Sequence, residues 1–206
     1  MRKIQIIKSV AVPWLLPNID TDIISPMKRM LYNINELDKY AFEPFRFLDG
    51  DGDKGEINPD FPLNMAVYRG AKIMIVGKNF GCGSSRETAP EGMAGMGIEC
   101  IIGSSFGGIF FKNCFQQGIL PIMLPLEIVH SMSEQTLEGE FEVNLYEQTI
   151  TTPRGEVVRF DVESLHRESL LKGLDDVSRT LKKVEAINQF KAKDKLLRPW
   201  IYCSTK

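Results

Sequence analysis

The sequence has no excess of positive charge. Its 206 residues contain 25 Lys and Arg against 27 Asp and Glu, which gives a formal net charge of -2. Such a balance provides neither the basic surface that holds nucleic acid nor a polybasic segment that binds a membrane. Hydrophobic residues make up 43% of the chain, enough for one sizeable core. We therefore expect a single domain, residues 1–206, whose partner is not nucleic acid.

A long uninterrupted apolar run is also missing near the start. Charges and prolines break up residues 1–20 before a signal-peptide core or a membrane-spanning helix is complete. We therefore expect a cytoplasmic protein that does not bind a membrane.

Paired cysteines are absent as well. The four cysteines lie far apart and form no CxxC pair: Cys82, Cys100, Cys114 and Cys203. This spacing predicts neither a zinc site nor an iron–sulfur cluster within the chain. Two of them, Cys100 and Cys114, are expected to be small core residues in a reducing compartment.

Strands and helices alternate along the first two thirds of the sequence. Strands are predicted at residues 4–12, 71–76, 98–102 and 119–124, and a helix at 104–117. A second helix is expected after the glycine-rich turn that follows residue 76. This alternation predicts an α/β fold with a parallel or mixed sheet covered by helices.

The pattern changes after Pro125. A short helix is predicted up to about residue 135, followed by strands at 141–145, 148–152 and 157–160, which indicate a small antiparallel meander. From about residue 162 the sequence is helical in pattern and rich in charge, so we expect a C-terminal helical extension with a solvated face.

An acidic, glycine-rich run, DGDGDKG, occupies residues 49–55. Aspartate and glycine tolerate left-handed backbone conformations, and we predict a long surface loop here. The run superficially resembles a calcium loop. However, the twelfth position counted from Asp49 is Asp60 rather than glutamate, and nearby prolines oppose the flanking helices that the motif needs.

Residues 79–87, NFGCGSSRE, stand where a buried strand gives way to a helix. Gly81 and Gly83, on either side of Cys82, permit a sharp turn and close approach of a ligand, while amides at a helix start favour an anion. Arg86 adds a planar fork that can bind a carboxylate or a phosphate through two nitrogens. The loop therefore indicates a binding site for negative charge.

Two serines in this loop, Ser84 and Ser85, offer hydroxyls that can donate to an anion or, once deprotonated, accept a proton. A structural alternative is open, because Ser84 with Glu87, or Thr88 with Glu91, also fits a helix capping box. The segment is neither a Walker motif nor a dinucleotide fingerprint, since no Gly-Lys-Ser/Thr ends it and Arg86 replaces the last glycine.

The string NFGCGSSRETAP at residues 79–90, together with NIDTDIISP at 18–26, resembles the swivel domain of the aconitase superfamily, and most nearly the bacterial small subunits of isopropylmalate isomerase. The resemblance runs from about Val10 to Asp175. It implies an aconitase-type swivelling β/β/α domain. Further matching strings are FRFL at 45–48, NPDF at 58–61, SF at 105–106, IF at 109–110, Asn113, LP at 120–121 and GLD at 173–175.

Roles for individual residues follow from this resemblance. Ser84 is expected to be the catalytic base that removes the proton next to a carboxylate, and Ser85 and Arg86 to hold substrate carboxylates. Asp20, Thr21 and Asp22 are expected to line the same cleft, although each also fits a simple Asx-type turn.

The implied activity is that of a hydro-lyase that converts 2-isopropylmalate to 3-isopropylmalate by dehydration and rehydration, in leucine biosynthesis. The implied cofactor, a [4Fe-4S] cluster, belongs to a separate large subunit, so we expect no cofactor in this chain and a heterodimer that completes the site. Amides and Arg86 would stabilise the serine alkoxide electrostatically.

One position departs from the family pattern. Bacterial members usually read Ser-Arg-Glu-His-Ala-Pro, and here Thr88 replaces the histidine. Thr88 fits a helix cap, or a paralogue that acts on another malate-type diacid such as citramalate, dimethylmalate or homocitrate. The two histidines of the chain, His130 and His166, lie outside any motif and are expected to be structural or exposed.

Two other classes of function stay open on the sequence. One is a module that binds a dicarboxylate or phosphate through the Gly-Ser-Ser-Arg loop without chemistry. The other is a structural partner that merely completes the large subunit.

Overall fold

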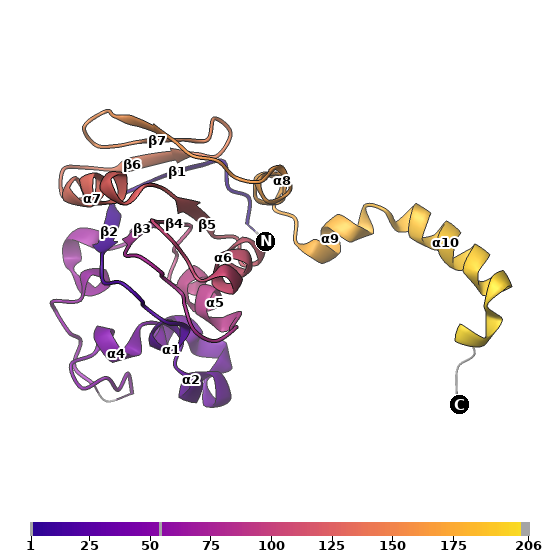
Figure 1. Cartoon of the computed structure of the whole chain (residues 1–206). Helices are drawn as coiled ribbons and strands as arrows, with labels where there is room; N and C mark the ends of the chain where they lie inside the picture. Colours follow the sequence, from indigo (N-terminus) through magenta and orange to yellow (C-terminus); the bar gives the residue numbers. More distant parts are fainter. Residues whose placement is uncertain (1, 54, 203–206) are drawn as a thin grey trace. The chain divides into compact units, whose positions relative to one another are not determined.

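The computed structural model describes residues 2–53 and 55–202, and Figure 1 shows its ribbon. The described residues form two compact units, one ending at Gly173 and the other beginning at Leu174. The first unit contains all the described strands and every residue for which we predict a role at the site.

One sheet of the first unit is parallel. Its strands, in spatial order, are β2 (Ala11–Trp14), β3 (Ile73–Val76), β4 (Cys100–Gly103) and β5 (Leu120–Met123). Parallel strands need crossover connections, and helix-containing segments supply them here. The predicted strands at 71–76, 98–102 and 119–124 are confirmed with slightly shifted bounds, as is the α/β class.

The other sheet is antiparallel. Its order is β1 (Ile6–Ser9), β6 (Phe141–Asn144), β7 (Thr149–Thr151) and β8 (Val157–Arg159). Side chains of β6 alternate between buried and half-buried, as expected for a strand with one face on the core. The predicted meander is confirmed, and it forms a sheet separate from the parallel one.

The single strand predicted at residues 4–12 is wrong. The segment divides into β1 and β2, which belong to different sheets. The break falls at Val10, beside Ser9, whose hydroxyl donates to the Val10 carbonyl at 2.8 Å and accepts from the Lys72 amide at 2.9 Å. No glycine or proline signals this break in the sequence. The Ser9 side chain makes it possible by bonding to two backbone groups.

Ten α-helices are described. Those of the first unit are α1 (Thr21–Ile24), α2 (Met27–Tyr32), α3 (Leu37–Tyr40), α4 (Glu43–Arg46), α5 (Thr88–Gly95), α6 (Gly108–Gln116), α7 (Leu126–Glu134) and α8 (Ser164–Lys172). Four short 3-10 helices lie at Ile34–Glu36, Pro62–Asn64, Ala66–Tyr68 and Pro199–Ile201. Within the described residues, no helix is both long and apolar enough to cross a membrane.

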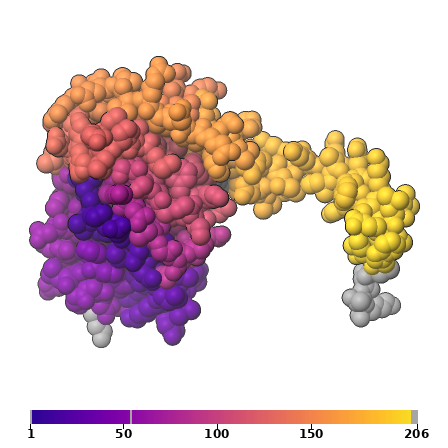
Figure 2. Space-filling view, viewed as in Figure 1, coloured from indigo at the N-terminus to yellow at the C-terminus, as the bar shows by residue number. Residues whose placement is uncertain are grey.

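The parallel sheet separates two buried clusters, because successive side chains of a strand point to opposite faces. Ile73 and Ile75 of β3 pack toward the antiparallel sheet with Phe141 and Val143. Met74 and its neighbours pack on the opposite side, where most of the helices lie. Figure 1 shows the antiparallel sheet above the parallel sheet and α1, α2 and α4 below it. Figure 2 shows the residues of β6, β7 and β8, in shades of orange, over the upper part of this unit.

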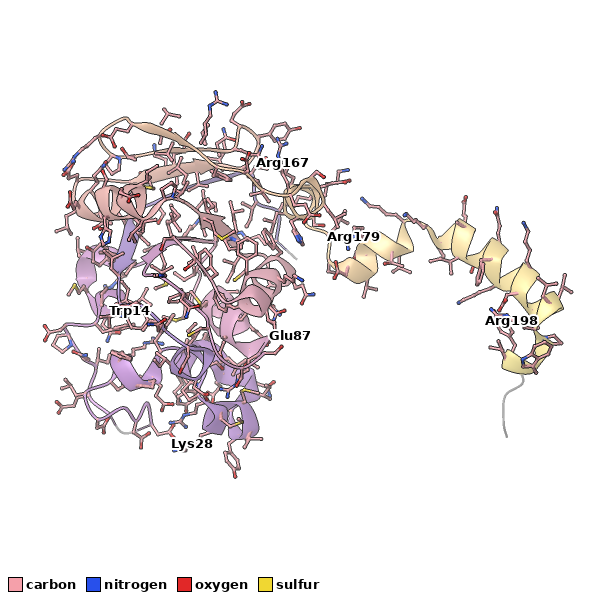
Figure 3. The ribbon with its side chains drawn as sticks, viewed as in Figure 1. Trp14, Lys28, Glu87, Arg167, Arg179 and Arg198 are labelled. Carbon is pink, nitrogen blue, oxygen red and sulfur yellow. The ribbon has the colours of Figure 1, made fainter. Side chains whose placement is uncertain are left out.

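Aromatic rings fill the helix-covered cluster. Trp14, at the end of β2, meets Phe42 edge-on with ring centroids 5.3 Å apart and Phe61 at 5.2 Å. Figure 3 shows Trp14 inside the ribbon and Lys28 at its outer edge. This packing fixes the carboxyl end of β2, from which the chain continues toward residues 18–25.

The helix predicted at residues 104–117 begins later, at Gly108. Ser105 and Phe106 are taken up by contacts to the preceding loop: the Ser105 hydroxyl accepts from the Asn79 amide at 2.9 Å, and Phe106 pairs with Phe80 in a parallel bridge. The start of α6 is therefore set by contacts with the loop that follows β3 rather than by local propensity.

The second unit is helical and contains α9 (Asp176–Leu181) and α10 (Val184–Leu197). The Asp175 side chain caps α9 by accepting from the Ser178 amide at 2.6 Å. The helical segment predicted from about residue 162 is found, but its first helix, α8, belongs to the first unit, where Leu170 is fully buried. The organisation as one domain stays a prediction.

Candidate active site

The loop at residues 79–87, called the glycine loop below, follows β3. It lies at the edge of the parallel sheet where the carboxyl ends of the strands meet. The segment after the neighbouring β2 reaches the same edge, and Asp20 forms a parallel bridge with Cys82. Two further backbone bonds join these segments: the Gly81 amide donates to the Ile19 carbonyl at 2.7 Å, and the Thr21 amide donates to the Cys82 carbonyl at 2.9 Å. The two motifs of the sequence therefore form one site.

Glycine is required at position 81 for two reasons. Gly81 has φ 70°, in the left-handed region, and a Cβ there would lie 2.2 Å from the ring of Phe110. Gly83 has φ 90°, with Asp20 3.4 Å from the place of a Cβ. The glycines let the loop turn tightly between α6 and α1.

Ser84 and Ser85 lie at the exposed tip of this loop. Among the described residues, none accepts a hydrogen bond from the hydroxyl or amide of either serine. Thr21, only 1% exposed, holds the loop from behind, because its hydroxyl donates to the Ser84 carbonyl at 3.0 Å. The exposed loop tip thus has four donors, two hydroxyls and two amides, that bond to no described residue.

Arg86 lies behind the serines and is 6% exposed. Its Nη1 donates to Asp22 Oδ1 at 2.5 Å and to the Ser25 carbonyl at 3.1 Å, and its Nη2 donates to Asp22 Oδ2 at 2.9 Å. Asp22 is the exposed partner, with 55% of its side chain accessible. The planar fork of Arg86 binds the carboxylate of Asp22 in this structure, and its binding of a substrate carboxylate stays a prediction.

Asp20, the third residue of the NIDTD motif, caps α1. Its Oδ1 accepts from the Ile23 amide at 2.8 Å. It is half-buried next to the loop, so it fixes the orientation of Thr21 and Asp22.

Neither predicted capping box forms. The N-cap of α5 is Glu87, and no side chain bonds to the free amides there. Figure 3 labels Glu87 at the start of this helix. Thr88 is nearly buried and accepts from the Ser25 hydroxyl at 3.2 Å. Thr88 therefore contacts the residue whose carbonyl anchors Arg86, instead of capping the helix.

An ion-pair cluster that the sequence analysis missed lies beyond α1. The Arg29 side chain is 2% exposed, and both carboxylate oxygens of Glu43 accept from its Nε, at 3.1 and 2.9 Å. Asp51 and Asp53 of the acidic loop also accept from Arg29, at 3.2 and 2.6 Å. The aspartates that suggested a calcium loop thus turn toward a guanidinium. The separation of 22 and 24 residues hid this pairing from local motifs.

No cluster site is evident within residues 2–53 and 55–202, where no group of three or more His, Cys, Asp or Glu could hold a metal ion. Cys100 and Cys114 are fully buried, as predicted, and burial raises the pKa of both thiols. Cys82 is half-buried in the loop. Cys203 lies outside the described residues.

The histidines are as expected. His130 is exposed on α7, and His166 stacks on Phe115 with ring centroids 4.2 Å apart.

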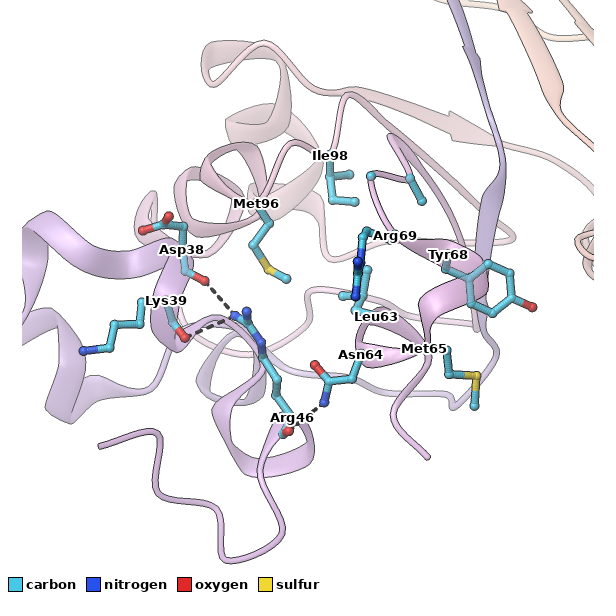
Figure 4. Close-up of a pocket in the computed structure, with 12 residues that line it drawn as sticks. Asp38, Lys39, Arg46, Leu63, Asn64, Met65, Tyr68, Arg69, Met96 and Ile98 are labelled. Carbon is cyan, nitrogen blue, oxygen red and sulfur yellow. Dashed lines mark hydrogen bonds between the residues drawn. The ribbon is translucent and has the colours of Figure 1, made fainter. Parts of the chain in front are cut away.

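A separate pocket of about 260 Å³ is lined by none of the predicted site residues. Figure 4 shows Arg46 within it, donating to the Asp38 and Lys39 carbonyls at 2.9 and 3.1 Å, with the Asn64 amide on the Arg46 carbonyl. Burial lowers the pKa of Arg46. These bonds tie α3, α4 and the Pro62–Asn64 helix together, so the arginine has a structural role.

Known proteins resemble this chain over most of its length. The aconitase C-terminal domain family matches residues 2–127. The 3-isopropylmalate dehydratase small subunit of Ruegeria pomeroyi is 45% identical over 206 residues, covering 98% of this chain and 100% of that protein. The small subunit of the same name from Saccharophagus degradans is 40% identical over 216 residues, covering 100% of each.

A solved structure has the same fold. The crystal structure of 3-isopropylmalate dehydratase from Methanocaldococcus jannaschii superposes with a TM-score of 0.61 at 28% sequence identity, covering 90% of this chain and 99% of that one.

Proposed function

We propose that this chain, which belongs to the aconitase C-terminal domain family, is the small subunit of a hydro-lyase that interconverts 2-isopropylmalate and 3-isopropylmalate. The enzyme would act in leucine biosynthesis and would be located in the cytoplasm. The proposal rests on similarity along the full length of small subunits that bear this name.

The observation that carries the chemical part is the position of Ser84. Its hydroxyl is exposed, lies two residues from a buried guanidinium, and bonds to no other described residue. The base would be the Ser84 alkoxide, which takes the substrate proton and becomes the hydroxyl, and no hydrogen bond from the described residues competes for this oxygen. Thr21 donates a hydrogen bond to the backbone carbonyl of Ser84 and not to its side chain.

Ser84 would act as the base that removes the proton next to a substrate carboxylate. A serine hydroxyl is a poor base, because its alkoxide is costly in water. The loop offsets part of this penalty: the positive charge of Arg86 and the unused amides of the loop favour the anionic oxygen. One preorganised donor of this kind contributes roughly 3 to 4 kcal/mol to a rate.

Ser85 and Arg86 would hold the substrate carboxylates. Ser85 lies at the same exposed loop tip as Ser84, and the neighbouring Arg86 supplies a planar fork. Asp20, Thr21 and Asp22 would line the cleft from the neighbouring segment and fix the shape of the loop.

The [4Fe-4S] cluster would belong to the large-subunit partner. The described cysteines of this chain do not fit it, since two are sealed in the core and the third stands alone in the loop. On the partner, the cluster would supply a Lewis acid for the hydroxyl that leaves. The small subunit would contribute the base and the residues that bind the substrate carboxylates.

The test is reconstitution. The chain is co-expressed with candidate large subunits, and the purified complexes are assayed for turnover of 2-isopropylmalate, citramalate, dimethylmalate, homocitrate and methylcitrate. We expect turnover of 2-isopropylmalate by the complex and none by this chain alone. Turnover of one of the other acids instead would assign a paralogous hydratase, and binding without any turnover would leave an anion-binding module.

A further inference from the structure

The exposed carboxylate of Asp22 pairs with Arg86, the positively charged residue for which we propose a role in binding substrate. Both terminal nitrogens of Arg86 donate to it, at 2.5 and 2.9 Å, and only 5% of the Arg86 side chain is accessible against 55% of that of Asp22. A guanidinium fork binds one carboxylate end-on. A diacid approaching from solvent therefore meets Asp22 before it meets Arg86.

We infer that Asp22 is an internal stand-in for a substrate carboxylate, and that the diacid binds by exchange of one carboxylate for the other. This inference rests on the proposed function, because it takes Arg86 as the residue that holds substrate. Asp22 would then not contact the substrate. It would position Arg86 until a substrate carboxylate displaces it.

The two ends of the pair are held very differently, which makes such an exchange possible. Arg86 keeps a second anchor when Asp22 leaves, because its Nη1 also donates to the Ser25 carbonyl at 3.1 Å. Ser25 in turn is bonded to Thr88. Asp22 lies on α1 with its side chain already half in water, so its carboxylate can turn outward without being desolvated.

Like charge also excludes the arrangement in which both carboxylates share the fork. Two carboxylates at one site repel each other, and one must leave or become protonated. The contribution of Arg86 to substrate affinity would then be the free energy of its pair with the substrate carboxylate minus that of its pair with Asp22. Asp22 would keep the buried guanidinium paired and correctly oriented while no diacid is present.

The experiment compares Asp22→Asn with the wild type in the complex with the large subunit. The asparagine keeps the shape and one acceptor but removes the competing charge. We expect KM for 2-isopropylmalate to fall about fivefold, because a half-exposed ion pair is a weak competitor, and kcat to stay within about twofold. Asp60→Asn is the matched control: it removes the same charge from an exposed loop of the same unit.

A raised or unchanged KM in Asp22→Asn would overturn the inference, since Asp22 would then be a fixed support for Arg86 and substrate would use another edge of the guanidinium. A fall in KM in Asp60→Asn of the same size would also overturn it, by assigning the effect to net charge. Asp22→Ser repeats the test if the asparagine variant does not assemble.

Binding of malonate, an unreactive dicarboxylate, is measured on the same complexes by calorimetry. Tighter binding by Asp22→Asn supports the exchange even if the wild-type complex does not turn over 2-isopropylmalate, a result that would overturn only the proposed function. Equal or weaker malonate binding, or none by either complex, contradicts the exchange.

Discussion

Two buried arginines of the first unit hold carboxylates in different surroundings. Arg29 is 2% exposed and its partner Glu43 is 6% exposed, whereas Arg86 is 5% exposed and its partner Asp22 is 55% exposed. A carboxylate sealed with its arginine cannot be replaced by a ligand. A carboxylate that faces water can. The accessibility of the acidic partner, rather than the arginine itself, separates a structural ion pair from one that can take part in binding.

The Arg29 pair is also more heavily supported. Besides Glu43, the guanidinium bonds to Asp51 and Asp53 and lies 3.8 Å from the centre of the Tyr40 ring. These contacts tie α2 to α4 and to the acidic loop. Since α2 begins two residues after Ser25, the cluster holds in place the segment that anchors Arg86.

The largest expected effect on stability is that of Glu43→Gln. It leaves a buried guanidinium without its buried counter-charge, and we expect the free energy of unfolding to fall by about 3 kcal/mol. Asp22→Asn is the matched control, because its partner carboxylate is exposed, and we expect a loss of about 1 kcal/mol or less. Urea denaturation of the chain measures both. Equal losses would abolish the distinction between the two pairs.

Arg86→Lys should act mainly on binding. A lysine keeps the charge but cannot present a planar fork to a carboxylate, so KM of the complex for 2-isopropylmalate should rise about tenfold. Steady-state kinetics provide the measurement. The matched control is Arg69→Lys, at an exposed arginine away from the loop. If Arg86→Lys leaves KM unchanged, the chain is a structural partner rather than a source of substrate contacts.

A smaller effect concerns the pH dependence of stability. The Tyr40 hydroxyl, followed by Arg29, lowers the pKa of Asp53 below its ordinary value of 3.8. This contribution is present above pH 3.8 and is lost as the pH falls through the lowered folded-state pKa. In Asp53→Asn it is absent at every pH.

The measurement for Asp53 is the urea midpoint as the pH falls from about 6 to about 3. The wild type should lose more stability over this range than Asp53→Asn. Parallel curves for the two proteins would show that Asp53 carries no such contribution.

Much of the fold could be predicted because its determinants are local. Apolar runs such as residues 71–76 mark buried strands, and the turn at Gly155 marks the meander. The break at Ser9 and the late start of α6 could not, since each depends on a side chain that bonds to a distant backbone group: Ser9 to Lys72, and Ser105 to Asn79.

The candidate site divides in the same way. The loop at residues 79–87 could be found from its glycines and its position after a strand. Its pairing with Asp22, 64 residues away, could not, nor could the pairing of Arg29 with Glu43, because ion-pair partners depend on how segments fold against each other. The capping box of Thr88 with Glu91 does not form, and the Thr88 hydroxyl instead accepts from Ser25, 63 residues away.

The most direct test of the central claim is the turnover of Ser84→Ala in the complex with the large subunit. The control is Ser131→Ala, at an exposed serine of α7. We predict that Ser84→Ala lowers kcat about 10²- to 10⁴-fold, the range for loss of a general base, with KM little changed. Ser131→Ala should match the wild type. Wild-type turnover by Ser84→Ala would contradict the account, because another group would then remove the proton.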